Sequence, residues 1–190
     1  MKKITFAFLF LISSFTLFAQ GTYQADPAHS KLGFTITHLG IADVPGHFDK
    51  FNVTVTTGKK DFSDAVVEMS AETNSVNTRV APRDKHLKSA DFFDVEKFPT
   101  LSFKSNSIKK IADNKYELSG NLLLHGISKP VTVQMWHRGS IQKKAGDKFT
   151  AGLQFTATIK RSDFELGSGF PAPMLSDEVI LKGDGEFLQQ

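Results

Sequence analysis

Charged and aromatic residues crowd the stretch Arg83–Asp94, which reads RDKHLKSADFFD. Asp84, His86 and Asp91 are residue types that exchange protons, so together they could form a general acid–base group. Nothing beside them suggests an activated nucleophile, and such catalysis needs a pocket with polar anchoring. The alternative is structural: a capped, salt-bridged helix. In it, Arg83 would pair with an acid across the open end of the β-barrel that the strand pattern predicts below. We favour the structural interpretation.

The histidines are the other candidates for chemistry, as ligands of zinc or iron, which need three or four converging side chains. Three of them, His29, His38 and His47, recur every nine residues, and odd spacings place strand residues on opposite faces unless loops intervene. No pair has the local spacing of a known site, so we expect no metal. We expect imidazoles that hydrogen-bond the backbone at turns.

Several function classes are excluded by what the sequence lacks. It contains no nucleotide-binding glycine motif and no esterase-type Gly-x-Ser-x-Gly. It contains no cysteine, which excludes disulfides, thiolate metal sites and cysteine nucleophiles. We therefore expect a domain that is stable through its core alone, with no catalytic residue and no cofactor.

Residues 1–19 read MKKITFAFLFLISSFTLFA and have the pattern of a secretory signal peptide. Lys2 and Lys3 precede an uncharged apolar run, and Ala19 is the small residue expected before a cleavage site. We expect one mature domain, residues 20–190, in the periplasm, with secretion as the alternative location. It would have no stable membrane span after cleavage; an uncleaved anchor is the competing interpretation. Loss of the two lysines lowers the net charge from +3 to +1, which argues against nucleic-acid binding.

Apolar and polar residues alternate along most of the chain after residue 22. The clearest runs are Leu32–Ile36, Phe51–Val55, Tyr116–Leu124 and Phe149–Ile159. Period two indicates strands with one apolar and one wet face. Seven or eight such strands joined by short turns predict an antiparallel, up-and-down meander, and closure into a β-barrel would hide its edges. The fold class is therefore all-β, with about eight strands.

One stretch departs from this alternation, and we expect a short helix there, at residues 82–91. Pro82 suits a first helical position, and Asp84 in the first turn favours the helix dipole. The helix would end at Phe92 and Phe93, which can enter the barrel.

The inner face of the predicted barrel mixes bulky residues with small ones such as Gly120, Ala157 and Gly183. Small inward residues either leave space along the barrel axis or mark bends in the strands, and both interpretations stay open. Phenylalanine, whose side chain has a large apolar surface and no hydrogen-bonding group, is the dominant aromatic residue. The loop Glu165–Leu175, rich in glycine and proline, would cover one end.

Four blocks in consistent order resemble the YceI-like polyisoprenoid-binding family. They are DPAHSKLGFTITHLGIADVPGHFDKF from Asp26, RDKHLKSADFFDVEKFPTLSFKS from Arg83, GNLLLHGISKPVTV from Gly120 and FTATIKRSDFEL from Phe155. The resemblance implies a lipocalin-like antiparallel barrel, export to the periplasm and a long hydrophobic pocket for an isoprenoid or other long-chain amphiphile. It implies no established catalysis. Glu165 departs from the glycine more usual in the family.

The implied ligand is a polyisoprenoid, quinone-like or fatty long-chain lipid. The residues expected to bind it are Phe34, Ile36, Phe51, Val53, Leu87, Phe92, Phe93, Phe103, Leu122, Leu124, Val133, Met135, Phe155, Phe164 and Phe170. At the mouth, His38, Arg83, Asp84 and His86 would contact a polar head group.

Three functions compete at this stage. The first is a lipid binder for carriage or storage, and the second is an enzyme acting on a lipid-like or isoprenoid substrate. The third is a ligand-free barrel with a structural, stress-related or partner-binding role. A homodimer is also left open.

The signal peptide is directly testable. We expect the exported protein to begin at or near Gln20, because Ala19 follows the apolar run. The intact mass of exported protein measures this, and a full-length mass in the membrane fraction would contradict it.

Overall fold

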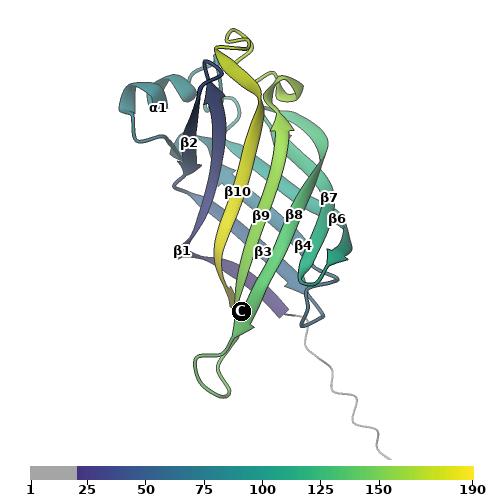
Figure 1. The fold of residues 1–190 in the computed structure, drawn as a ribbon. Coiled ribbons are helices and arrows are strands. Elements are labelled where there is room, and N and C mark those ends of the chain that lie inside the picture. The colour runs from purple at the N-terminus through teal and green to yellow at the C-terminus, as the bar shows by residue number, and fades with distance from the viewer. Residues whose placement is uncertain (1–20) are drawn as a thin grey trace, which may run out of the picture.

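The computed structural model describes residues 21–190, and the predicted signal peptide lies outside them. In the described part, ten strands form one antiparallel sheet that closes on itself (Figure 1). The strands are β1 (Gly21–His38), β2 (Ala42–Phe48), β3 (Phe51–Thr57), β4 (Val66–Glu72), β5 (Val76–Asn77), β6 (Thr100–Ala112), β7 (Lys115–Leu124), β8 (Ile127–Ile141), β9 (Thr150–Lys160) and β10 (Leu175–Gln189). The helices are α1 (Ala81–Leu87) and two short 3₁₀ turns, η1 (Thr73–Ser75) and η2 (Arg161–Phe164). No helix within residues 21–190 is both long and apolar enough to span a bilayer.

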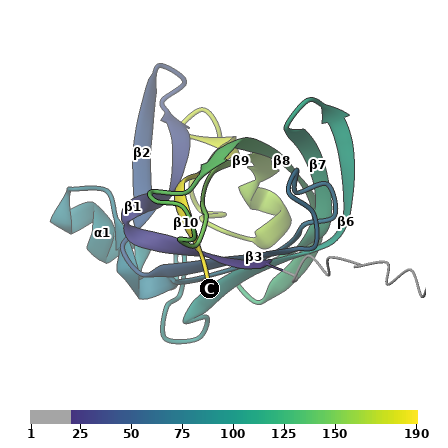
Figure 2. The ribbon, with the colours of Figure 1, turned by 90° about the horizontal axis from the view of Figure 1, so that it is seen from below.

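Pairing of β1 with β10 closes the barrel, from Tyr23 opposite Gln189 to His38 opposite Leu175. The ring is completed by β9, β8, β7, β6, β4 and β3, and it encloses the barrel axis (Figure 2). Strands β2 and β3 follow one another along the same edge of β1, β3 beside its first residues and β2 beside its last. The predicted all-β antiparallel barrel of about eight strands is confirmed, with β2 and β5 extending it at one end.

The end of the barrel near the β8–β9 loop, at the bottom of Figure 1, is solid. Its inward side chains are almost fully buried, including Tyr116, Leu118 and Leu153. Phe62 closes this end from the β3–β4 loop, with its ring centroid 5.0 Å from that of Tyr23. The hydroxyl of Tyr116 donates a hydrogen bond to a carbonyl of the same loop. The strands are therefore joined here by continuous apolar packing.

Helix α1 ends at Leu87, four residues earlier than the sequence predicts. Pro82 does lie in its first turn. The hydroxyl of Ser89 donates to the carbonyl of His86 at 2.8 Å, which competes with a further helical turn. The chain then folds back, and the N–H of Phe93 donates to the carbonyl of Leu87 at 3.0 Å. This turn directs Phe92 and Phe93 inward, and both are buried.

Some small inward residues leave space inside the barrel, which is one of the two interpretations left open by the sequence, while Gly120 has a different role, in close contact with a neighbouring ring. A side chain at Gly120 would meet the ring of Phe103 at 2.6 Å, so this glycine lets an aromatic ring lie flat across the inner face. Gly183 and Ala157 instead face open space inside the barrel.

His137 is a buried titratable group in the solid half, with 6% of its surface exposed. Its Nε2 lies 2.9 Å from the Ser140 hydroxyl, and its ring centroid lies 4.4 Å from that of Phe62. Its Nδ1 is the one buried side-chain polar atom of the described residues without a hydrogen-bond partner. Burial lowers the pKa of His137 below its ordinary value of 6.5, because the charged imidazolium is disfavoured there.

A pH dependence of stability follows. In the unfolded chain His137 takes up a proton near pH 6.5, whereas in the folded chain it does so only at a lower pH. The free energy of unfolding therefore decreases as the pH falls from about 6.5 toward the lowered pKa of the folded state. Melting temperatures of wild type and His137→Gln between pH 7.5 and 5.5 measure this, and the wild type should lose more stability on acidification. His29→Gln is the control of opposite sign, since a hydrogen bond to Asp26 raises the pKa of His29. Identical slopes for wild type and His137→Gln would contradict the assignment.

Candidate ligand-binding cavity

The other half of the barrel is hollow and holds a cavity of about 450 Å³. The same strands line both halves: on β9, Leu153 lies in the solid core, while Ala157 and Ile159 face the cavity. Four lining residues are exposed, and three of them, His38, His86 and Met174, lie toward the same end; the fourth is Lys182 on β10. The cavity therefore reaches the surface at the end where the β1–β2 turn and the loop before β10 lie, at the top of Figure 1.

Most of the apolar residues that the sequence predicts for ligand contact line this cavity. They are Phe34, Ile36, Val53, Leu87, Phe92, Phe93, Phe103, Leu122, Leu124, Val133, Phe155 and Phe170. The structure thus brings together residues from strands, from the α1 segment and from the loop before β10. Their role in binding a ligand stays a prediction.

Three predicted contact residues lie elsewhere. Met135 has the inward orientation that was expected, but it pairs with Tyr116 in the solid half and is 1% exposed. Phe164 is buried in η2, where its carbonyl lies 3.0 Å from Nδ1 of His125. Phe51 is half-buried at the start of β3 and packs against the core without facing the cavity. Alternation identifies which face of a strand a residue is on, but not its depth along the barrel axis.

The cavity also contains residues that sequence reasoning did not select. Most of them share the inward alternation and could have been included: Leu32, Val67, Met69, Leu101, Val131, Ile159, Val179 and Leu181. Val44 and Phe48 on β2 had no such signal, because Pro45 and Gly46 interrupt that strand's pattern.

Thr78, a buried residue just before α1, organises the charged residues at the mouth. Arg83 donates from Nε to the Thr78 hydroxyl at 2.7 Å and from Nη2 to the Thr78 carbonyl at 3.0 Å. The Asp84 carboxylate accepts from the N–H and the hydroxyl of Thr78, at 2.8 and 2.5 Å. The prediction that Arg83 pairs with an acid is therefore wrong. Among the described residues, its hydrogen-bond partner is Thr78. Arg83 lines the cavity, and Asp84 does not.

His86 joins α1 to the loop before β10. Its Nε2 lies 3.0 Å from Asp91, and its ring is edge-on to Phe92 and Phe170, with centroids 5.0 and 5.4 Å away. Phe92 and Phe170 stack on each other with centroids 5.0 Å apart. Of the acid–base group considered from the sequence, only His86 and Asp91 meet, because Asp84 turns back to Thr78.

Arg161, which sequence reasoning missed, is 5% exposed and holds the loop before β10 in place. Its five N–H groups meet the carbonyls of five residues at 2.5 to 3.2 Å: Leu166, Gly167, Phe170, Leu175 and Ser176. Five is the full donor capacity of a guanidinium, so Arg161 has no donor left for a ligand. No local sequence signal distinguishes this arginine from its surface counterparts.

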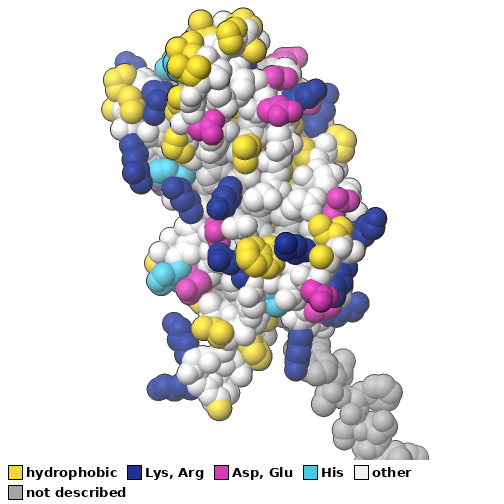
Figure 3. Space-filling view, viewed as in Figure 1, with side chains coloured by type: hydrophobic (Ala, Val, Ile, Leu, Met, Phe, Trp, Pro, Cys, Tyr) yellow, Lys and Arg dark blue, Asp and Glu magenta, His cyan; other side chains and the backbone are white. Residues whose placement is uncertain are grey.

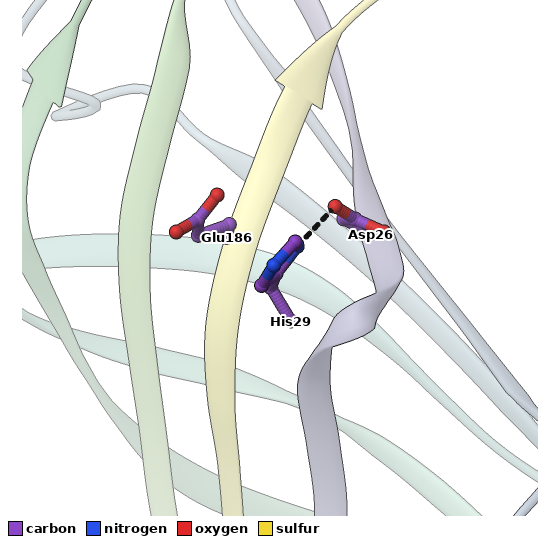
Figure 4. Close-up of side chains that lie close together, drawn as sticks. All are labelled: Asp26, His29 and Glu186. Atoms are coloured by element: carbon purple, nitrogen blue, oxygen red, sulfur yellow. Dashed lines mark hydrogen bonds and ion pairs between the residues drawn. The ribbon is translucent and has the colours of Figure 1, made fainter.

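Within residues 21–190, His29, His38 and His47 do not gather into one group of potential metal ligands. His47 lies 3.0 Å from Asp49, and His38 lines the cavity. His29 does gather with Asp26 and Glu186 on the outer surface (Figure 4), where its Nδ1 lies 2.7 Å from Asp26. This hydrogen bond lowers the pKa of Asp26 and raises that of His29, so the contact is accounted for as an exposed ion pair. The expected absence of a metal stays a prediction.

The comparisons with known proteins agree with this architecture. The model of the YceI-like domain matches residues 23–187. The chain belongs to the YceI-like family. Among curated relatives, protein YceI of Salmonella agona is 35% identical over 189 residues, covering 97% of this chain and 98% of the relative. The family resemblance read from the four sequence blocks is thus confirmed.

Solved structures of YceI-like and related proteins share the barrel. The Campylobacter jejuni YceI protein is 29% identical with a TM-score of 0.73, over 81% of this chain and 90% of that chain. Burkholderia cenocepacia BcnA is 24% identical with a TM-score of 0.74, over 87% and 99%. A polyisoprenoid binding domain from Saccharophagus degradans, implicated in plant cell wall breakdown, is 15% identical with a TM-score of 0.63, over 90% and 99%. At such identities the last two show the fold alone.

The role of Arg161 is testable by substitution. Arg161→Lys keeps the charge but has three donors for five carbonyls, so we expect the free energy of unfolding to fall by about 1–3 kcal/mol. Amide exchange in residues 165–175 should speed up. Arg138→Lys is the matched control, because Arg138 is half exposed and pairs with Asp184 at 3.5 Å, a contact that contributes about 0–1 kcal/mol. Equal effects of the two substitutions on stability and exchange would contradict the assigned role.

Proposed function

We propose that the protein is an exported lipid binder that holds a polyisoprenoid or similar long-chain amphiphile in the barrel, for carriage or storage. The observation that carries this proposal is the apolar cavity, which occupies half of the barrel and reaches the surface at one end. Its volume of about 450 Å³ falls within the roughly 300–1,000 Å³ typical of small-molecule sites. A fully packed barrel with a purely structural role would have no reason to keep such a space.

The distribution of polar groups supports an amphiphile with its tail inside. The interior wall is made of aliphatic and phenylalanine side chains, while His38, Arg83 and His86 lie toward the mouth. Arg83 uses two of its five N–H donors on Thr78, one on Nε and one on Nη2, which leaves the donors of Nη1 and the second of Nη2 for a polar head group. Arg161, although it also lines the cavity, is saturated by carbonyls. The head group would therefore sit beside α1, with the chain extending toward Phe103 and Phe155.

Relatives add independent support. A solved domain with the same fold is described as polyisoprenoid binding, and the family to which this chain belongs is a binding fold rather than a catalytic one. The walls select length and shape, so a quinone-like or fatty lipid meets the same requirements as an isoprenoid.

An enzyme acting on a lipid-like substrate is the second candidate, favoured by one observation. His86 and Asp91 form a hydrogen-bonded pair at the cavity mouth, where a general base could reach a polar group of a bound lipid. His86→Ala separates the two functions. A binder should retain its lipid once folded, whereas an enzyme should lose turnover of a lipid ester or quinone-like substrate while stability and binding stay intact.

The binding function is tested by what the purified protein contains. Organic extraction followed by mass spectrometry should yield a long-chain apolar compound. Ala157→Trp places an indole in the cavity and should lower the bound lipid about ten-fold or more, whereas Thr158→Trp, the next residue and exposed on the outer face, should leave it unchanged. Circular dichroism checks that both variants fold. Repeated extractions without lipid, or equal lipid in the two variants, would refute the proposal.

A further inference from the structure

Exposed apolar side chains gather at the open end of the barrel. Leu39 and Ile41, in the turn between β1 and β2, are 52% and 83% exposed, and Met174 in the loop before β10 is 46% exposed. The N–H of Leu39 donates to the carbonyl of Met174 at 3.0 Å, so the turn and the loop lie side by side. With the exposed residues that precede Met174, these form what we call the apolar rim: Leu39, Ile41, Pro171, Ala172, Pro173 and Met174.

A single exposed leucine is ordinary, but a contiguous apolar group marks an interaction surface. The space-filling view shows apolar side chains clustered over the loops at this end (Figure 3). The rim is also fixed in place. Arg161 binds the carbonyls of the loop that carries Met174, and that loop packs on Phe92 through Phe170. Its apolar groups are thus held at the surface by the fold.

Folding does not account for Leu39. Its φ is 53° and that of Gly40 is 71°, and the N–H of Ile41 donates to the carbonyl of His38 at 3.1 Å. Two central residues with positive φ define a hairpin turn whose first central position favours asparagine or aspartate. A leucine there is unfavourable for the backbone, and half of its surface packs against nothing. The residue type therefore fits a role outside the folded chain.

The rim is continuous with the cavity, and this identifies its partner. Met174 belongs to both, and its neighbour Leu175, which pairs with His38 on β1, also lines the cavity. An apolar chain that moves through this opening passes directly from the cavity wall to the rim. Transfer into hydrocarbon at that point would spare it contact with water.

We propose that the apolar rim inserts into the surface of a lipid bilayer, so that the cavity opens toward the membrane for loading or delivery. This deepens the proposed lipid-binding function and rests on it. The α1 segment, which His86 joins to the rim loop through Phe170, carries the basic residues Arg79, Lys85 and Lys88, while its acids Asp84 and Asp91 are bound to Thr78 and His86. Anionic head groups therefore strengthen the docking, by about five-fold for each basic residue near the surface.

Vesicle flotation tests the docking. Wild-type protein should float with vesicles of phosphatidylcholine and phosphatidylglycerol, and less with phosphatidylcholine alone. Leu39→Asp and Ile41→Asp should each lower the bound fraction about ten-fold, because an apolar side chain leaves the interface and a charge enters it. Ile141→Asp is the matched control: Ile141 is 62% exposed at the closed end of the barrel, and its substitution should leave binding unchanged.

Two further readouts make the test decisive. Leu39→Asp should keep or raise the melting temperature, because aspartate suits the turn, so loss of flotation would not reflect unfolding. The lipid content of each variant is measured in parallel by extraction, since neither Leu39 nor Ile41 lines the cavity. Lipid-loaded protein that does not float, or rim variants that float like wild type, would overturn the docking while leaving the binding function standing. Rim-dependent flotation without any extractable lipid would support the docking and count against the binding function.

Discussion

The guanidinium of Arg161 determines the form of the barrel's open end. A buried cation without an acidic partner is costly unless its donors are satisfied, and here carbonyls of the loop before β10 and of the first two residues of β10 satisfy all five. That arrangement fixes the loop before β10, and the loop in turn positions Phe170 against Phe92 and Met174 beside Leu39. The cavity wall, the mouth and the exposed rim thus share one support.

The positive charge of Arg161 is also placed so that it does not interfere with the apolar interior of the barrel. Asp177 lies nearby, and although burial raises its pKa, hydrogen bonds from Ser162 and the charge of Arg161 lower it on balance. The carbonyls, however, are the direct partners, so the cation is stabilised by backbone dipoles of the loop and of the start of β10. Arg83, by contrast, keeps a donor available at the mouth.

Local periodicity accounts for what could be predicted from the sequence. Alternation on β7 and β9 identified the inward faces correctly, and the glycine- and proline-rich loop was expected at one end. The depth of a residue along the barrel axis could not be predicted. Met135 and Val133 have the same inward alternation on β8, yet Met135 lies in the solid half and Val133 faces the cavity. The boundary between the solid and hollow halves depends on buried side chains that are distant in sequence, such as Phe62. The pairing of Thr78 with Arg83 and Asp84, and the five carbonyls around Arg161, likewise depend on tertiary approach that no short window contains.

Because one half of the barrel is solid and the other hollow, residues that determine stability and residues that determine which ligand is bound can change independently. Removing methyl groups in the packed half opens a new void and costs stability in proportion to its volume. In the hollow half, a smaller side chain only enlarges a space that exists already, and a larger one has room to enter. Sequence change there alters the shape offered to a ligand at little thermodynamic risk. Relatives can therefore diverge in what they hold while the Tyr116–Leu153 half keeps the barrel folded.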